Sequence, residues 1–396
     1  MRQMRLSVVR LASESKQAPY QPLTSTILRE AQIVHARNFR DGRMALTPKD
    51  IDDCIDKLYG SRTGGGELRQ LAQLFSASFW RDFEALLRRE FTRTTGPFTQ
   101  EVRGGLGYID KIPLAKLKAG TVDINGNLIT EKTEVGDAAF FFIDDHYLAD
   151  GTLHSRSARG LILQAKQAIS GTLPKAVPIV PLPKKQNDST LKELAFLSTW
   201  PTFDLYFSSG SHKYLQKGYE VARPNDDGVI DPPKAWYIGA SPAVTTAWSP
   251  RWIAGPSVSG DPCSETLGSL LHAVLEDRGQ LGGVEAVGKS FDFVPTRLQV
   301  GDFKLASTGA PPTWDDLCHQ LILACSSIDL PHHLFSQSAK RGVGVEFHAN
   351  PLGSVLETLG ELLRALGRKL GVLPQRRFAV VVVERRSGEG RFPPLA

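Results

Sequence analysis

The sequence predicts an α/β protein with a mixed sheet flanked by helices, and three patterns support this prediction. Two apolar runs, Phe140–Phe142 and Leu161–Leu163, enclose a polar, glycine-containing turn from Asp144 to Arg159, as expected for two strands of one hairpin or meander. From Glu67 to Phe91, apolar residues recur at helical spacing, which indicates one long amphipathic helix or two. Near the C-terminus, Phe378–Val383 is a continuous apolar run, typical of a strand buried on both faces.

The composition is that of an ordinary globular protein. The chain has 396 residues, of which 41% are hydrophobic and 22% charged, so it is long enough for two or three domains. Its formal net charge of +5 permits an acidic polymer as ligand without requiring one. The four cysteines are too scattered for a zinc module or a disulfide framework, and no apolar run approaches the ~20 residues that span a bilayer. We therefore expect a soluble, cytoplasmic protein with no membrane partner.

The N-terminal part combines a basic segment with a helix. Residues 1–46 are rich in arginine, and a solvated face or loose arm explains them better than a nucleic-acid-binding arm. Thr47, Pro48 and Asp50 form a helix start, with a capping hydroxyl, a proline in the first turn and an acid at the positive end of the helix dipole. This helix is predicted to end near Tyr59.

Two polar stretches are predicted to be β structure and loop. Asn125-Gly126 between short apolar segments is a hairpin signal within a β excursion from Pro97 to Lys132. A proline-rich loop follows the second strand of the central hairpin, because proline disrupts helix interiors. Lysines in these stretches suit phosphate contacts, although a polar rim explains them more simply; they are Lys111, Lys116, Lys118, Lys184 and Lys185.

The C-terminal half is predicted to be a second α/β unit of recognition or assembly type. Trp236–Ile238 forms a short strand in this prediction, and three helices are expected over Glu265–Leu275, Trp314–Ala324 and Val355–Leu370. The predicted division is therefore an N-terminal arm and helix over 1–62, a central core over 63–222 and a C-terminal α/β domain over 223–396.

The central hairpin also carries a candidate site. In a strand, alternate residues share a face, so Gln164 and Lys166 point the same way. Asp137 stands at the start of the neighbouring strand. An acid and a polar-x-Lys pair on adjacent strands can converge at a solvated sheet edge, which is the geometry that a hydrolytic metal site needs.

These residues resemble the PD-(D/E)xK nuclease superfamily, in particular the Mrr-like restriction endonucleases with a Gln-x-Lys motif. The matching residues are Gly136-Asp137 and Gln164-Ala165-Lys166. The family pattern also has a glutamate on the helix before the first core strand, which Glu84 fits, with Glu67, Glu90 and Glu101 as substitutes. It further has a helix and a strand after the lysine, for which Ser189–Trp200 and Phe203–Gly210 stand in the right order.

The resemblance implies a restriction-endonuclease-like fold and a divalent-metal-dependent endonuclease. Glu84, Asp137 and Gln164 would hold Mg²⁺ or Mn²⁺, and Lys166 would orient the attacking water or stabilise developing charge. Gln164 replaces the more common acid and removes one negative charge, so the number of metal ions stays open. The implied substrate is nucleic acid, DNA before RNA, and the implied setting is bacterial antiviral defence. Because an uncontrolled nuclease would damage its host, we also expect a homo-oligomer or a partner subunit that controls activity.

Two other functions stay open. One is a catalytically silent nuclease-fold module that binds nucleic acid or a partner protein. The other is a nucleotide-binding protein, since Gly283–Ser290 satisfies the P-loop pattern; the flanking sequence reads as helix before and strand after, so we interpret this match as accidental. The histidines, among them His332 and His333, have no carboxylate at helical ligand spacing.

Overall fold

The computed structural model describes residues 46–59, 66–91, 98–109, 112–207, 216–221, 233–242, 248, 250–276, 279, 281, 287–295, 310–330, 332–335, 378–389 and 392. They belong to one compact unit, Met44–Ala396. The predicted arm over 1–46 lies almost wholly outside the described residues, and the predicted helix over Val355–Leu370 lies wholly outside them. No described helix is long and apolar enough to cross a membrane.

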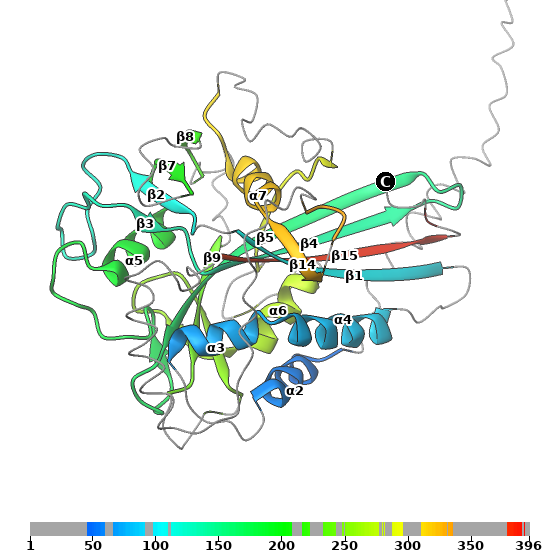
Figure 1. Ribbon diagram of the computed structural model, residues 1–396, viewed down its shortest axis with the longest axis horizontal. Helices are drawn as coiled ribbons and strands as arrows, with labels where there is room; N and C mark the ends of the chain where they lie inside the picture. The colour runs from blue at the N-terminus through cyan, green and yellow to red at the C-terminus, as the bar shows by residue number, and fades with distance from the viewer. Residues whose placement is uncertain are drawn as a thin grey trace, which may run out of the picture. The chain divides into compact units, whose positions relative to one another are not determined.

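A large mixed sheet dominates the unit, which agrees with the predicted α/β class (Figure 1). Its order is β12-β10-β9-β5-β4-β15-β1-β14, and β13 also pairs with β5. The strands are β1 (Phe98–Ile109), β4 (Ala138–Tyr147), β5 (Leu153–Gln167), β9 (Ala235–Ala240), β10 (Trp252–Pro256), β12 (Glu265–Thr266), β13 (Lys289–Ser290), β14 (Ser326–Leu330) and β15 (Phe378–Glu389).

The predicted central hairpin is present as the antiparallel pair β4–β5, but its strands are much longer than predicted. Asp144 and Asp145 belong to β4, so the predicted turn from Asp144 to Arg159 is wrong. The reason is cross-strand neutralisation: Asp145 faces Arg156 in the register, and their side chains form an ion pair at 2.5 Å. Because their charges are paired across the strands, these polar residues extend the β4–β5 pairing beyond the apolar run.

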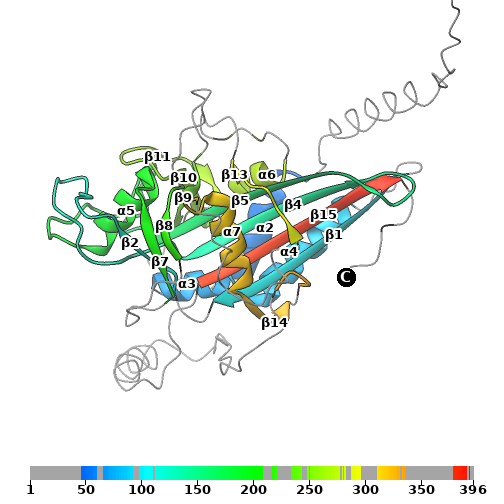
Figure 2. The ribbon, with the colours of Figure 1, turned by 90° about the horizontal axis from the view of Figure 1, so that it is seen from above.

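The C-terminal strand β15 does not belong to a separate domain. It lies between β1 and β4, antiparallel to the first and parallel to the second (Figure 2). β9, β10 and β12, from the same predicted third domain, also pair into this sheet. The predicted boundary at residue 222 therefore does not divide the unit. A strand with apolar residues on both faces must be buried on both faces, and the centre of the large sheet provides this burial.

Helices cover both faces of the sheet. The α4/α6 face is packed by α2 (Pro48–Tyr59), α3 (Glu67–Leu74), α4 (Ala77–Phe91) and α6 (Leu267–Leu275). The opposite α5/α7 face is packed by α5 (Ser189–Thr199) and α7 (Trp314–Leu323). Alternating strand residues divide between the two cores: Phe140 and Leu163 face α4/α6, whereas Phe141 and Ile162 face α5/α7.

The predicted helices at 47–59 and 67–91 are confirmed, the second as two helices. Asp50 accepts from the backbone N–H of Thr47 at 2.8 Å and so closes the first turn of α2. Asp52 then joins α2 to α6, because its carboxylate accepts from Thr266 Oγ1 at 2.6 Å and from the backbone N–H of Gly268 at 2.8 Å. At Gly268 a Cβ would lie 2.4 Å from the carbonyl oxygen of Pro48, so glycine permits this close approach.

A smaller sheet adjoins the large one, in the order β3 (Thr133–Glu134), β2 (Leu114–Leu117), β7 (Phe203–Tyr206) and β8 (Gln216–Tyr219). The strand predicted after α5 is therefore real as β7, but it lies in this small sheet, and β9 is the parallel neighbour of β5. The predicted Asn-Gly hairpin appears as an antiparallel bridge between Val122 and Leu128. A two-stranded ribbon joins β6 (Lys175–Ala176) to β11 (Pro262–Cys263).

Candidate active site

Gly136 brings Asp137 against β5. Its φ of +151° and its surroundings both select glycine, since a Cβ there would lie 2.5 Å from Ile162 Cγ2. The backbone N–H of Asp137 donates to the carbonyl of Leu163 at 2.9 Å. Gly136 therefore lets the chain approach β5 closely, and this approach sets the position of the Asp137 carboxylate.

Asp137 and Gln164 meet as predicted. Gln164 Nε2 donates to Asp137 Oδ2 at 2.7 Å, and the backbone N–H of Ala165 donates to the same oxygen at 2.7 Å. Both side chains are buried rather than placed at a solvated edge, with residue exposures of 2% and 0%. The Oε1 atom of Gln164 is buried without a hydrogen-bond partner, so it is available as an oxygen ligand.

Lys166 is paired with a glutamate that the sequence interpretation missed. Its Nζ donates to Glu193 Oε2 of α5 at 2.6 Å, and both side chains are almost fully buried. Burial by itself lowers the pKa of Lys166, but the charge and hydrogen bond of Glu193, with the charges of Glu67 and Glu134, outweigh it and raise the pKa above its ordinary value. The ammonium group is therefore charged at neutral pH.

Glu193 was detectable in principle. Every residue from Leu191 to Leu197 on α5 is buried, including Lys192 and Glu193. A helix buried all round must provide partners for its charged residues, since unpaired buried charges are very costly. Lys192 pairs with Glu131 at 2.8 Å and Glu193 pairs with Lys166.

Glu84 does not join this group. It lies on α4 against Gly104, on the α4/α6 face, and forms an ion pair with Arg88 at 2.7 Å. In the sheet, Gly104 of β1 lies level with Phe142 of β4, with β15 between them. Phe142 is five residues after Asp137, so Glu84 and Asp137 are separated by about 16 Å along the strands. The helix periodicity could not decide which glutamate reaches the strand end, because that depends on the crossing of helix and sheet.

Glu67, a predicted substitute, takes the place expected for Glu84. It begins α3, and its carboxylate accepts from the backbone N–H of Gln167 at 3.2 Å, one residue after Lys166. Its charge acts on both Lys166 and Glu193. We call this group the acid–lysine cluster; its members are Glu67, Glu134, Asp137, Gln164, Lys166 and Glu193.

The acid–lysine cluster can hold a hard divalent cation by the chemistry of its donors. It contains four carboxyl groups, one amide and one ammonium group, so acidic oxygens are in excess. Its carboxylates do not form a compact set of three: among the described residues, the group whose ligand atoms lie within 4.8 Å of one another is His332, His333 and Glu384. Binding of a metal ion at the acid–lysine cluster therefore requires the side chains of Asp137 and Gln164 to turn toward it.

A second polar group, the His–Glu cluster, consists of His332, His333 and Glu384. Burial, followed by repulsion from His333, Arg103 and Arg386, lowers the pKa of His332 to about 3. Burial and the two arginines lower the pKa of His333 to about 4. The sequence gives no local signal for this group, because the carboxylate comes from β15, 51 residues after His333.

The described part of the P-loop pattern is not a phosphate loop. Lys289 and Ser290 form β13, which pairs with Arg159 and Gly160 of β5, and residues 291–294 after it are not helical. Without a helix N-terminus behind the lysine, the amide dipoles that would bind phosphate are missing from this position.

We therefore expect Lys289→Ala to change neither nucleotide binding nor cleavage. The measurement is a calorimetric titration of the wild-type and variant proteins with ATP. Saturable ATP binding that disappears in the variant would contradict this interpretation.

Glu193 also predicts a pH dependence of stability. Burial raises its pKa to about 7 in spite of the attraction of Lys166. A carboxyl group with a raised pKa holds its proton longer in the folded state, so its stabilising effect is complete below pH ~4.5 and is lost as the pH rises through about 7. We expect the free energy of unfolding in urea to fall between pH 5 and pH 8, and Glu193→Gln to reduce or reverse this fall. An equal fall in both proteins would exclude Glu193 as its cause.

No protein-family model, no curated protein and no solved structure matches this chain.

Proposed function

We propose that this protein is a divalent-metal-dependent nuclease whose active site is the acid–lysine cluster. The observation that carries the proposal is the 2.7 Å contact between Asp137 and Gln164 on adjacent strands, with Lys166 on the same face of β5. These three residues carry the sequence resemblance to the PD-(D/E)xK nucleases. The contact between side chains of two separate short motifs supports the proposal.

The order of elements supports the proposal. Helices α3 and α4 precede β1, the antiparallel pair β4–β5 carries the motif, α5 follows, and β9 is parallel to β5. This is the helix, antiparallel strands, helix and parallel strand that a restriction-endonuclease-like core would have. The departure is β15, which separates β1 from β4.

The residues divide the chemistry of phosphodiester hydrolysis as follows. Asp137, Glu67 and the Gln164 amide oxygen would hold Mg²⁺ or Mn²⁺, which when bound polarises the phosphoryl oxygen and lowers the pKa of a ligated water. Lys166 orients the attacking water and stabilises negative charge on the phosphate. Glu193 keeps the ammonium charged and holds it in place. The backbone N–H of Ala165 holds the Asp137 carboxylate at the strand start.

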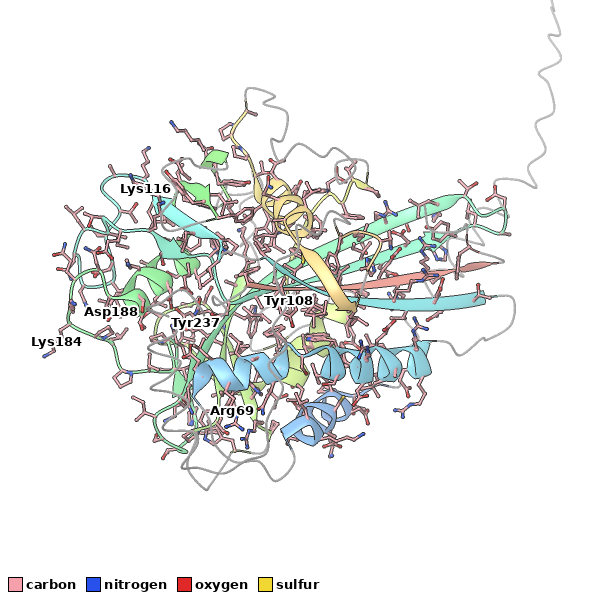
Figure 3. The ribbon with its side chains drawn as sticks, viewed as in Figure 1. Arg69, Tyr108, Lys116, Lys184, Asp188 and Tyr237 are labelled. Atoms are coloured by element: carbon pink, nitrogen blue, oxygen red, sulfur yellow. The ribbon has the colours of Figure 1, made fainter. Side chains whose placement is uncertain are left out.

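Exposed lysines near the small sheet supply a surface for a polyanion. Lys116 in β2 and Lys184 in the proline-rich loop are exposed and point away from the protein interior (Figure 3). Lys118 and Lys185 are exposed as well. Contacts with phosphates would make binding tolerant of sequence and sensitive to salt.

The test is incubation of the purified chain with plasmid DNA and with RNA, in Mg²⁺, Mn²⁺ or EDTA. We expect cleavage with the metals and none with EDTA, with DNA preferred. Tight control of activity by self-association or by a partner subunit, as in a defence system, would appear as a rise in specific activity with protein concentration or on addition of that subunit. Absence of metal-dependent cleavage under all these conditions would refute the nuclease.

Glu67 and Glu84 provide a test of the site's geometry. Glu67→Gln is expected to reduce cleavage by about tenfold or more, because it removes the charge of one proposed metal ligand. Glu84→Gln is the matched control and should cleave at the wild-type rate, because Glu84 contacts the sheet about 16 Å along the strands from Asp137. The measurement is the initial rate of plasmid nicking at saturating Mg²⁺. Loss of activity in Glu84→Gln alone would place the site on the α4/α6 face.

A catalytically silent nucleic-acid-binding module is the second candidate, and one observation favours it. Lys166 and Glu193 neutralise each other inside the protein, as a purely structural pair would. Nucleic-acid binding that weakens with salt, without cleavage under any metal condition, would select this candidate.

A further inference from the structure

The His–Glu cluster lies on the α5/α7 face, in the middle of strand β15 and away from the acid–lysine cluster. Glu384 in β15 is level with Ile143 in β4, six residues from Asp137, or about 20 Å along the strand. His332 and His333 belong to the segment 332–335 that follows β14. The two clusters are therefore separate sites.

Gly105 in β1 allows the histidine segment to lie flat on the sheet. A Cβ at this position would be 2.5 Å from His332 Cβ and 2.9 Å from Phe335 Cε2. The position thus requires glycine for the histidine segment to approach β1 so closely. This approach places the imidazole of His332 beside Glu384, which is two strands from β14 in the sheet.

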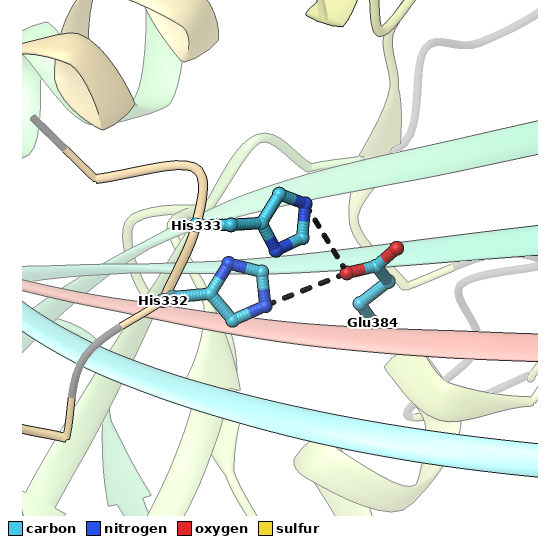
Figure 4. Close-up of side chains that lie close together, drawn as sticks. All are labelled: His332, His333 and Glu384. Atoms are coloured by element: carbon cyan, nitrogen blue, oxygen red, sulfur yellow. Dashed lines mark ion pairs between the residues drawn. The ribbon is translucent and has the colours of Figure 1, made fainter. Parts of the chain in front are cut away.

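The ligand atoms have the spacing of a metal site (Figure 4). Glu384 Oε2 is 3.6 Å from His332 Nε2 and 3.6 Å from His333 Nε2, and all three atoms lie within 4.8 Å of one another. Bonds of about 2.0–2.2 Å at tetrahedral angles separate two ligand atoms by about 3.3–3.6 Å. An ion between the three atoms would thus need only small side-chain movements.

Two of these atoms are unsatisfied inside the protein. His332 Nε2 and Glu384 Oε2 are buried and have no hydrogen-bond partner, and their side chains are only 2% and 5% exposed. Buried polar atoms without partners are rare in folded proteins and point to an unseen ligand. His333 is 25% exposed, so solvent reaches one side of the cluster.

The surroundings orient the carboxylate. Arg386 Nε donates to Glu384 Oε1 at 3.0 Å, which leaves Oε2 turned to the histidines. His332 Nδ1 accepts a long bond of 3.4 Å from the backbone N–H of Leu334, a contact that gives way when Nδ1 carries the proton of a metal-bound imidazole. Arg103 and Arg386 oppose a cation here, while the carboxylates of Glu384 and Asp145 favour one.

We propose that His332, His333 and Glu384 bind one divalent transition-metal ion through two imidazole nitrogens and one carboxylate oxygen. Two nitrogens and one oxygen suit Zn²⁺, Co²⁺ or Fe²⁺ and not Mg²⁺ or Ca²⁺, which take oxygen ligands. The three protein ligands leave at least one position for water on the side of His333. The ion joins segment 332–335 to the central strand β15.

The test is metal binding by the full chain after removal of metal with a chelator. Co²⁺ is titrated with its visible absorption as the signal, and Zn²⁺ is titrated by calorimetry. We expect one high-affinity ion per chain at the His–Glu cluster, with its Kd raised by more than about 100-fold in His333→Ala and in Glu384→Gln. His154→Ala, which removes an exposed histidine outside the cluster, should bind like the wild type.

Three further measurements make the outcome unambiguous. Zn²⁺ should raise the melting temperature of the wild type and not of His333→Ala, and circular dichroism should show that both are folded. Asp137→Asn should retain Co²⁺ binding, so the metal site at the His–Glu cluster is tested independently of the proposed nuclease activity. No stoichiometric Co²⁺ or Zn²⁺ binding by the wild type, or equal binding by His333→Ala and Glu384→Gln, would overturn the proposal.

Discussion

Asp137→Asn is expected to abolish metal-dependent cleavage while the protein stays folded. The substitution removes the charged oxygen at the strand start but keeps the size and one carbonyl oxygen of the side chain. That oxygen can still accept a hydrogen bond from the backbone N–H of Ala165, which in the wild type donates to Asp137 Oδ2 at 2.7 Å. Loss of the charge should lower the cleavage rate by about 10²–10³-fold or more, because neither the metal nor the phosphate is then positioned.

The measurement for Asp137→Asn is the initial rate of plasmid cleavage over a range of Mg²⁺ concentrations, with urea unfolding as the stability control. The free energy of unfolding should fall by no more than about 1–2 kcal/mol, since the two buried hydrogen bonds from Gln164 and Ala165 keep an acceptor but lose its charge. Asp150→Asn, in the exposed turn between β4 and β5, is the matched control and should cleave normally. Cleavage by Asp137→Asn at the wild-type rate would place the nuclease site elsewhere.

Lys166→Met is expected to be damaging in two ways that a second substitution can separate. It removes the positive charge of the proposed active site and leaves Glu193 buried without its partner at 2.6 Å. Breaking a buried ion pair in this way typically costs about 3–5 kcal/mol of folding free energy. Cleavage should also fall by about 10²-fold or more, because the charge acts on the transition state.

The double variant Lys166→Met/Glu193→Leu should recover most of the stability but none of the cleavage. Replacing both members of a buried pair by apolar residues removes the unpaired charge, so the two substitutions are strongly coupled in a double-mutant cycle. Lys49→Met, which breaks the exposed pair of Lys49 and Asp53, is the stability control and should behave like the wild type. Recovery of cleavage in the double variant would show that Lys166 acts through folding alone.

The structure changes the expected effect of substituting Asp144 or Asp145, which the predicted turn would have made small. In β4 they are buried and bound to arginines, Asp144 to Arg385 and Asp145 to Arg156, both at 2.5 Å. Their replacement by alanine should therefore destabilise the fold, because each substitution removes an ion pair with a buried carboxylate. A loss of activity in either variant must be compared with its loss of stability before it is assigned to catalysis.

Local patterns in the sequence determined the elements that depend on neighbouring residues. The β4–β5 hairpin, the helices α2 to α7 and the apolar strand at Phe378 follow from periodicity and capping, which act over a few residues. The pairing of Asp137 with Gln164 was also predictable, because a hairpin brings its own two strands together. For these features the local and the global structure agree.

Only the tertiary structure decided which distant segments meet. β15 enters the sheet between β1 and β4, the charge of Glu67 rather than of Glu84 acts on Lys166, and His332, which follows β14, meets Glu384 two strands away. Each of these contacts depends on strand order and helix crossing, which are set by the burial of both sheet faces at once. Apolar periodicity shows that a strand such as β15 must be buried, but many neighbours would bury it equally well, so its place is decided by packing of the whole unit.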